Sequence, residues 1–310
     1  MDNGTAVTEF FLLGLTDVQE LQSFLFGLLL IFYLINVVGN GAIVMIVSSE
    51  PRFHSPMYFF LGNLSCLDIC FSTVTLPKLL ANLLSARKAI SFLGCITQLH
   101  FFHFLGSAEA TLLAVMALDR FVAICRPLRY PVIMSRWVCI LLAGATWATG
   151  FFHALLHSVL TSRLSFCGSH HIPHFFCDVK PLLVLACGSI ELNLWLLNTF
   201  TGSLATGPFF LTLLSYLYLI GFLLLQSRSW RALSKALSTC VAHFSVVILF
   251  YIPVAVAYAS PSSGDSLVQD RANAVMYSVV TPVLNPLIYT LRNRDVKEAL
   301  KKIFTRKFSA

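Results

Sequence analysis

Four polar side chains stand in the middle of long apolar stretches of the sequence, where charge is unusual. Asp68 and Glu109 are carboxylic acids, and Asn40 and Asn285 are carboxamides. Charge within a membrane is costly and is usually paired or functional. Together these groups could hold a sodium ion, or the two carboxylates could share a proton, because neighbouring like charges cannot both ionise freely there. Alternatively, each carboxyl is separately protonated and only joins helices by hydrogen bonds.

A second charged pair, Asp119 and Arg120, ends the apolar stretch that contains Glu109. Glu109 and Arg120 are 11 residues apart, which in a helix puts them on one face and about 16 Å apart. A guanidinium is expensive to bury unless it is paired, and Asp119 offers a partner. The alternative is that Arg120 merely reaches lipid headgroups and anchors its helix.

Four of the nine cysteines are candidates for disulfide bonds. Cys95 opens one apolar stretch, and Cys167, Cys177 and Cys187 follow one another at intervals of ten in a polar segment. Four cysteines allow two disulfides in three pairings, among which the sequence does not choose. Histidines beside Cys177 and Asp178 raise the alternative of a metal site. A disulfide-bonded cysteine cannot be a ligand, so no metal is expected.

The bulk composition indicates what surrounds these residues. Of the 310 residues, 57% are hydrophobic and only 11% are charged, whereas a soluble domain carries roughly a quarter charged residues. A bilayer crossing needs about 20 apolar residues, and seven stretches qualify: 24–47, 57–84, 92–118, 137–161, 192–226, 236–260 and 272–291. We therefore predict an all-α membrane protein in which residues 1–310 form a single seven-helix domain.

Basic residues set the expected orientation, because Lys and Arg favour cytoplasmic loops. With the N-terminus outside, fourteen of them fall in inner segments and five in outer ones. Residues 1–23 are then extracellular, with a candidate glycosylation site at Asn3. Residues 292–310 form a cytoplasmic tail whose apolar and basic faces predict a short amphipathic helix on the membrane. The net charge of +7 therefore reflects topology, and no nucleic acid partner is expected.

Several motifs occur in a fixed order along the chain. They are PRFHSPMYFFLGNLS (51–65), MALDRFVAIC (116–125), KALSTC (235–240) and PVLNPLIY (282–289). Together with the evenly spaced cysteines, they resemble the olfactory receptors, a group of rhodopsin-like (class A) G-protein-coupled receptors. The resemblance covers nearly the whole chain. One departure is Ile252-Pro253, which stands where the family usually has glycine.

The resemblance implies a receptor in the plasma membrane that binds a small, hydrophobic, volatile odorant in the outer half of its bundle. It implies disulfides between Cys95 and Cys177 and between Cys167 and Cys187. The ligand-binding positions that it implies are His103, Gly106, Ser107, Phe200, Thr201, Leu204, Val254, Tyr258, Val275 and Ser278.

The resemblance also implies coupling to a stimulatory, olfactory-type G protein that raises cyclic AMP. The coupling and activation residues that it implies are Asp119, Arg120, Tyr216, Lys235, Tyr251, Asn285, Pro286 and Tyr289. A transporter would need inverted repeats or paired broken helices, and a membrane enzyme would need a motif such as HExxH or GxSxG. The sequence has none of these. We therefore expect no enzyme and no cofactor other than the sodium ion considered for Asp68 and Glu109.

Overall fold

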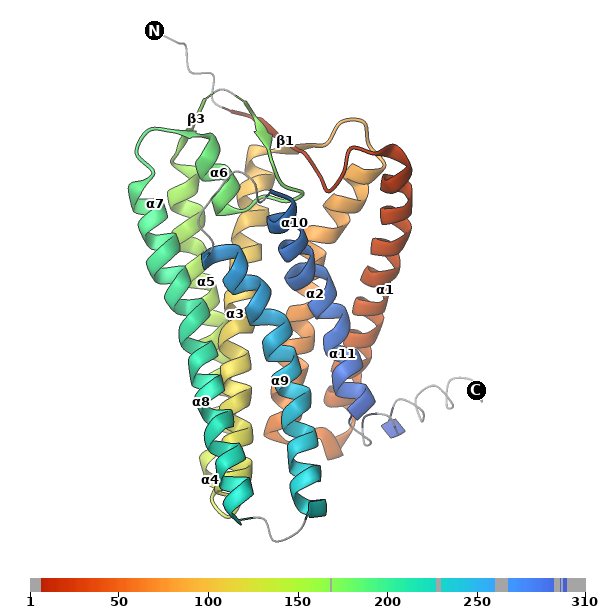
Figure 1. The fold of residues 1–310 in the computed structure, drawn as a ribbon, viewed down its shortest axis with the longest axis vertical. Coiled ribbons are helices and arrows are strands. Elements are labelled where there is room, and N and C mark those ends of the chain that lie inside the picture. Colours follow the sequence, from red (N-terminus) through yellow and green to blue (C-terminus); the bar gives the residue numbers. More distant parts are fainter. Residues whose placement is uncertain are drawn as a thin grey trace.

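The computed structural model describes residues 7–167, 169–226, 230–259, 267–292, 296 and 298–299. Within them, seven spans stand side by side in one bundle (Figure 1). Five spans are single helices: α1 (Gln19–Ser49), α2 (Pro56–Leu83), α3 (Phe92–Cys125), α5 (Arg136–Ser162) and α9 (Trp230–Ala259). The other two each contain a π-helical turn: α7 (Glu191–Leu196), η2 (Leu197–Thr201) and α8 (Gly202–Gln226), then α10 (Leu267–Val275), η3 (Met276–Val280) and α11 (Thr281–Arg292).

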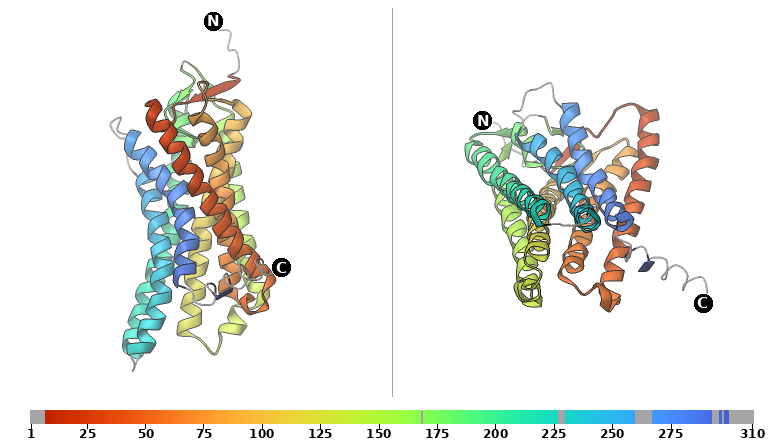
Figure 2. Two further views of the ribbon diagram at one scale, coloured as in Figure 1. Left: turned by 90° about the vertical axis from the view of Figure 1, so that its right-hand side faces the viewer. Right: turned by 60° about the horizontal axis from the view of Figure 1, so that its bottom comes forward.

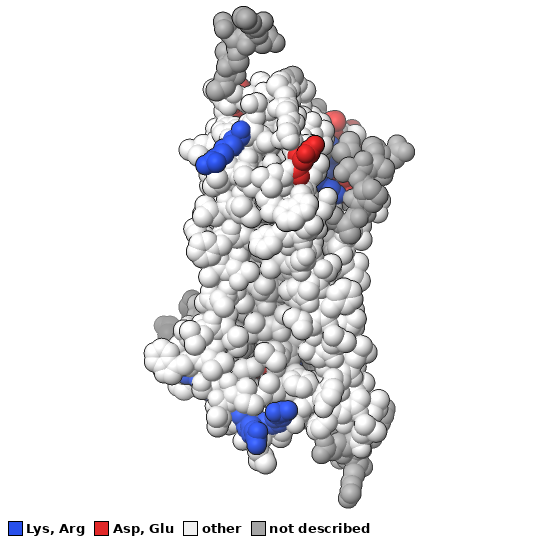
Figure 3. All heavy atoms as spheres, turned by 90° about the vertical axis from the view of Figure 1, so that its left-hand side faces the viewer, with Lys and Arg blue, Asp and Glu red and all other residues white. Residues whose placement is uncertain are grey.

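The surface of the bundle fits a membrane. In the described residues, α1, α2, α5 and the α7–α8 unit are long and apolar enough to cross a bilayer by length and composition alone. On the face drawn in Figure 3, charged side chains gather towards the two ends and leave a broad uncharged band between them. Such a band suits hydrocarbon. The prediction of an all-α bundle of seven membrane-spanning helices is confirmed.

Helix ends differ from the predicted spans most at the end of α3, and α1, α9 and α10 begin earlier than predicted, at Gln19, Trp230 and Leu267. α3 continues to Cys125 instead of ending at residue 118, so Asp119 and Arg120 lie within it. The predicted amphipathic helix at 292–307 falls almost wholly outside the described residues. Two of its residues are described and buried, Val296 and Ala299, and they pack with the ends of α1 and α2.

One end of the bundle, here called the sheet end, is covered by short strands that the sequence did not suggest. β1 (Glu9–Leu12) pairs antiparallel with β2 (Ala89–Ser91) and parallel with β4 (His171–Ile172). Alternate strand residues point to one side, and Phe10 and Leu12 are accordingly buried. β3 (Ser165–Phe166) pairs with β5 (Ala186–Cys187). The predicted extracellular segment 1–23 therefore contains a strand and the start of α1.

Two disulfides fix the segment between α5 and α7 at the same end. Cys95 is bonded to Cys177, which ties the start of α3 to this segment, and Cys167 is bonded to Cys187 within it. These are the two pairs that the resemblance implies. A short helix of the segment, α6 (Val179–Leu185), follows Cys177 directly. The opposite end of the bundle carries the turn η1 (Pro51–Phe53) and the short helix α4 (Tyr130–Ile133) and is called the α4 end.

The centre of the bundle is α3, which packs against α2, α5, α8 and α9 (Figure 2). α5 approaches it closely at Gly150. A Cβ atom on Gly150 would lie 2.4 Å from the carbonyl oxygen of Phe104 and 3.0 Å from the amide nitrogen of Ala108. Membrane helices approach this closely only where small residues meet. Gly150 therefore lets the two backbones touch.

Replacing Gly150 by alanine should destabilise the bundle, because the added carbon meets backbone atoms that cannot rotate away. Overpacking of this kind typically costs about 1–3 kcal/mol. Gly144→Ala is the matched control on the same helix, since a Cβ there meets nothing within 4 Å. Thermal unfolding of the purified protein should show a lower Tm for Gly150→Ala only. Equal Tm values for the two variants would contradict the close contact.

Candidate ligand site

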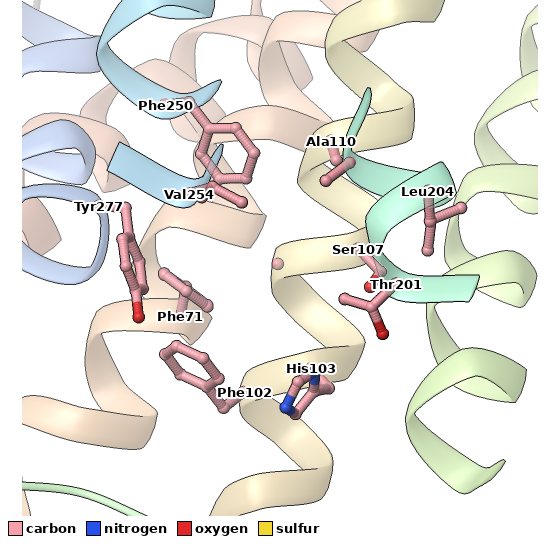
Figure 4. Close-up of a pocket in the computed structure, with 12 residues that line it drawn as sticks. Phe71, Phe102, His103, Ser107, Ala110, Thr201, Leu204, Phe250, Val254 and Tyr277 are labelled. Carbon is pink, nitrogen blue, oxygen red and sulfur yellow. The ribbon is translucent and has the colours of Figure 1, made fainter. Parts of the chain in front are cut away.

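A cavity lies between α2, α3, α8, α9 and the two π-helical turns. Its volume is about 50 Å³, which is room for the centres of a few water-sized atoms. Apolar side chains with a few polar groups form the wall, as is typical of small-molecule sites. The lining residues are Phe71, Phe102, His103, Gly106, Ser107, Ala110, Thr201, Leu204, Ala205, Phe250, Val254 and Tyr277 (Figure 4).

Six of the ten implied ligand positions line this cavity: His103, Gly106, Ser107, Thr201, Leu204 and Val254. Three others do not. Phe200 is 44% exposed and lies against the ring of His153. Val275 packs against the apolar core, and the buried Ser278 donates its hydroxyl to the Ala274 carbonyl at 2.5 Å. The side chain of Tyr258 lies outside the described residues.

Helical periodicity could have found several of the residues that the sequence analysis missed. Residues four apart share a face of a helix, so Phe102 and Ala110 lie on the face of Gly106. The same spacing relates Ala205 to Thr201 and Phe250 to Val254. No such signal marks Phe71 or Tyr277, because they come from helices whose rotation the sequence leaves open.

Behind the cavity wall, buried hydroxyls and imidazoles form a continuous chain of contacts. The Ser107 hydroxyl lies 2.8 Å from Nδ1 of His153, and Nε2 of His153 lies 2.9 Å from the Thr201 hydroxyl. The same hydroxyl is 2.9 Å from Nε2 of His157. The chain therefore links α3, α5 and η2. Neither α5 histidine figures in the expectations from sequence.

The third histidine of the site, His103, is held by Asp178. A carboxylate can only accept, so Nε2 of His103 donates to Oδ1 of Asp178 at 2.9 Å. Asp178 also caps α6, where the Val179 amide donates to it at 2.7 Å. Burial acts to raise the pKa of Asp178, but the hydrogen bond from His103, with further charge and backbone contributions, brings that pKa below its ordinary value. An anionic carboxylate is therefore stable at this edge of the site.

Comparison with known proteins decides the family. The model of the olfactory receptor family matches residues 29–307. The chain is 68% identical to human olfactory receptor 12D1, over 99% of this chain and 96% of that one. It is 47% identical to mouse olfactory receptor 1M1, over 99% of this chain and 98% of that one. The chain belongs to the olfactory receptor family. It is therefore an odorant-sensing G-protein-coupled receptor and not an enzyme.

Deeper in the receptor, the four residues predicted to form an ion or proton site are all buried, and two of them are in direct contact. The Asn285 amide donates to both carboxylate oxygens of Asp68, at 3.0 and 3.1 Å. Asn40 donates to the Pro282 carbonyl at 3.1 Å. Glu109 is fully buried, and within the described part of the chain neither of its carboxylate oxygens has a hydrogen-bond partner. Asp68 and Glu109 are close enough to repel each other if both are ionised.

At the α4 end, the receptor holds Arg120 against its neighbour. Nε of Arg120 donates to Asp119 at 3.0 Å, and the Tyr130 hydroxyl donates to the other oxygen of Asp119 at 2.7 Å. The Tyr216 hydroxyl lies 2.6 Å from Nδ1 of His243 on α9. Asp119 is therefore the partner of Arg120 in this state, and the roles of Tyr130 and His243 are additions to those that the resemblance implies.

The remaining implied coupling residues are placed as follows. Tyr251 donates its hydroxyl to the Ala110 carbonyl at 2.6 Å, which joins α9 to α3. Pro286 packs against Gly39 on α1, where a Cβ atom would come within 3.2 Å of its ring. The hydroxyl of Tyr289 is buried with no partner among the described residues. The side chain of Lys235 lies outside them.

Asp178→Ala should lower the free energy of unfolding of the receptor by roughly 1–3 kcal/mol, because it removes an acceptor from a buried donor and the N-cap of α6. Denaturant unfolding of the purified receptor measures this effect. Asp17→Ala is the control, since that side chain is 93% exposed and makes only a 3.9 Å contact with Lys88. In a His103→Phe background the Asp178→Ala effect should shrink. An undiminished effect there would rule out the His103 contact as its source.

Proposed function

We propose that the receptor binds a small, mostly hydrophobic volatile ligand in the cavity and activates a stimulatory, olfactory-type G protein, which raises cyclic AMP. The observation that carries the proposal is the mostly apolar cavity with its few polar groups. The cavity touches α9 through Phe250 and Val254, and α9 also contacts α8 at the α4 end through His243. A ligand need only bind the active state better than the inactive one.

The proposal places the receptor in the plasma membrane with its sheet end outside and its α4 end in the cytoplasm. The excess of basic residues in the segments at and beyond the α4 end supports this orientation. Two disulfides at the sheet end support it as well, since disulfides persist in oxidising surroundings. Asn3, the candidate glycosylation site, belongs to the same outer segment but lies outside the described residues.

Coupling is proposed to run through Arg120. In the state described above its guanidinium is held by Asp119, and Tyr216 and His243 lie between α8 and α9. If α9 swings away from α3, Arg120 can extend into the opening and meet the G protein. Lys235, at the start of α9, adds positive charge near the same end. Tyr289 offers a buried hydroxyl without a partner among the described residues, which Tyr216 can meet after the movement.

Arg120→Lys should abolish most ligand-evoked cyclic AMP, because lysine lacks the planar fork of donors that guanidinium offers. The assay uses intact cells and normalises signal to surface receptor, detected with an N-terminal tag on unpermeabilised cells. The control is Arg126→Lys, which exchanges an exposed arginine one turn and a half further along the chain. Full signalling from Arg120→Lys would leave Arg120 as a membrane anchor only. Tag staining only after permeabilisation would reverse the orientation.

The polar centre is proposed to hold a sodium ion or a shared proton in the inactive state, with Asp68, Glu109, Asn40 and Asn285 around it. Glu109 supports this, since two buried oxygens with no described hydrogen-bond partner are costly unless protonated or bound to a cation. Asp68→Asn should then change how basal and ligand-evoked cyclic AMP respond to replacement of sodium by choline and to pH. Unchanged responses to both would leave the cluster a purely structural one.

A further inference from the structure

Hydroxyls on the helices of this receptor usually bond back to their own backbone. Thr73, Thr111 and Ser245 each donate to the carbonyl four residues earlier, at 2.6, 3.0 and 2.7 Å. This is the normal way to satisfy a hydroxyl within a membrane helix. Among the described contacts, Ser107 and Thr201 make no such bond. Both line the cavity, and both contact His153 instead.

The two histidines that contact these hydroxyls lie in surroundings that keep their rings uncharged. His153 and His157 are each 1% exposed, and neither ring is hydrogen-bonded to a carboxylate in the described structure. A buried imidazolium without a paired anion is strongly disfavoured. Within the described residues, no three His, Cys, Asp or Glu side chains are placed to hold a metal ion. The rings therefore act as hydrogen-bonding groups, each with one N–H and one bare nitrogen.

A count of the hydrogens in this series of contacts shows whether a hydrogen-bond donor is left for the cavity. Three contacts join four groups, Ser107, His153, Thr201 and His157, and each contact uses one hydrogen. When His157 carries its hydrogen on Nε2, that nitrogen donates to Thr201, and the four groups hold one hydrogen more than the contacts need. The surplus hydrogen belongs to the Ser107 hydroxyl if His153 is protonated on Nδ1, and to the Thr201 hydroxyl if it is protonated on Nε2.

The surplus hydrogen therefore sits on one of two hydroxyls that form the cavity wall, which Figure 4 shows together on the side away from Tyr277. A buried donor left unmatched is costly, and an acceptor in the cavity removes that cost. In a third arrangement His157 is protonated on Nδ1, the extra hydrogen lies on that nitrogen, and both hydroxyl hydrogens are used in the chain. An acceptor ligand in the cavity therefore stabilises the first two arrangements.

The charged groups around the cavity further restrict the chemical class of the ligand. Among the described residues no Lys or Arg lines it, so a carboxylate ligand would enter without such a counter-ion and close to the anionic Asp178. Asp178 is not among the lining residues, and its Oδ1 already receives the His103 ring and the Val179 amide, so an amine ligand would find no carboxylate among the described residues of the cavity wall. With carboxylates and amines disfavoured, the cavity suits neutral ligands.

We propose that the cavity selects neutral ligands that carry a hydrogen-bond acceptor oxygen, such as ketones, and that His153 is the positioning residue that turns the Ser107 and Thr201 hydroxyls from the backbone towards it. The inference rests on the proposed function of the cavity as the odorant site and names the ligand class of that site.

The test measures binding directly, without the G protein. The full receptor in lipid nanodiscs is heated with ketones of graded size, cyclohexanone among them. Each ketone is paired with the alkene that replaces C=O by C=CH2, and with the corresponding amine and carboxylate. Ketones should raise Tm at concentrations roughly tenfold below those of their alkenes, which is the factor expected of one net hydrogen bond. Equal potency of ketone and alkene, or a preference for amines or carboxylates, would overturn the proposal.

Variants of the two α5 histidines should behave differently. In a His157→Phe background, His153→Phe should erase the ketone preference, because no imidazole then holds either hydroxyl and both can turn back to backbone carbonyls. In the same background His153→Gln, which restores a donor and an acceptor, should recover part of the preference. His157→Phe should retain the preference, since two contacts among three groups still leave one hydrogen over. The control is His100→Phe: His100 contacts Ser158 at 3.1 Å and does not line the cavity. A ketone preference that survives the double variant His153→Phe/His157→Phe, or is lost in His157→Phe alone, would contradict the hydrogen count.

Parallel cyclic AMP assays separate this proposal from the proposed function. Ketone-selective stabilisation without any cyclic AMP response would support the ligand class and count against the proposed coupling. Cyclic AMP responses confined to amines, carboxylates or hydrocarbons would support the coupling and overturn the ligand class.

Discussion

The missing side chain at Gly150 lets the backbone of α5 touch α3 beside Phe104 and Ala108. Because α3 is one uninterrupted helix from Phe92 to Cys125, this contact fixes the depth and rotation of every functional group along it. The contact also determines which side chains of α5 face the cavity. His153 and His157 follow Gly150 by three and seven residues, so all three share a face of α5. The glycine that admits the α3 backbone thus directs both imidazoles at the wall of the cavity.

The sequence predicted what depends on composition and on position along a single helix. Apolar length located the seven spans, and motif positions located lining residues such as His103 and Ser107. What it missed depends on rotation. The π-helical turn η2 fits an extra residue into its turn, which leaves Thr201 facing the cavity and Phe200 on the outside. Tyr277 lies in the second such turn, η3, so the face on which its side chain lies does not follow from regular α-helical spacing. An apolar window cannot reveal such turns, because it records which residues are present and not where they point.

Polar groups inside the bundle show the same limit. Asp68 and Glu109 look alike in sequence, as single carboxyls in apolar spans. In the structure Asp68 receives two hydrogen bonds from Asn285, whereas Glu109 has no described hydrogen-bond partner. Asn36, which no sequence motif marks, donates to the Asp68 backbone carbonyl at 3.1 Å. Whether a buried polar group is satisfied depends on neighbours from other helices, and only their packing decides it.

The path from the cavity to the α4 end runs along α9, and Pro253 gives that helix a defined weak point. Proline has no N–H for the carbonyl four residues earlier, and that carbonyl, on Leu249, instead accepts the Thr281 hydroxyl of α11 at 3.0 Å. Phe250 lines the cavity, and the next residue, Tyr251, ties α9 to α3 through Ala110, another lining residue. A ligand therefore sits against Ala110, which accepts that bond, and against Phe250, the neighbour of its donor. From Phe250, two helical turns of about 10 Å in all lead to His243, which is in contact with Tyr216. α9 makes both the bond to Ala110 and the contact with Tyr216, so a ligand that loosens the first also alters how often the second is formed. This requires that the ligand bind the loosened state more tightly than the other state.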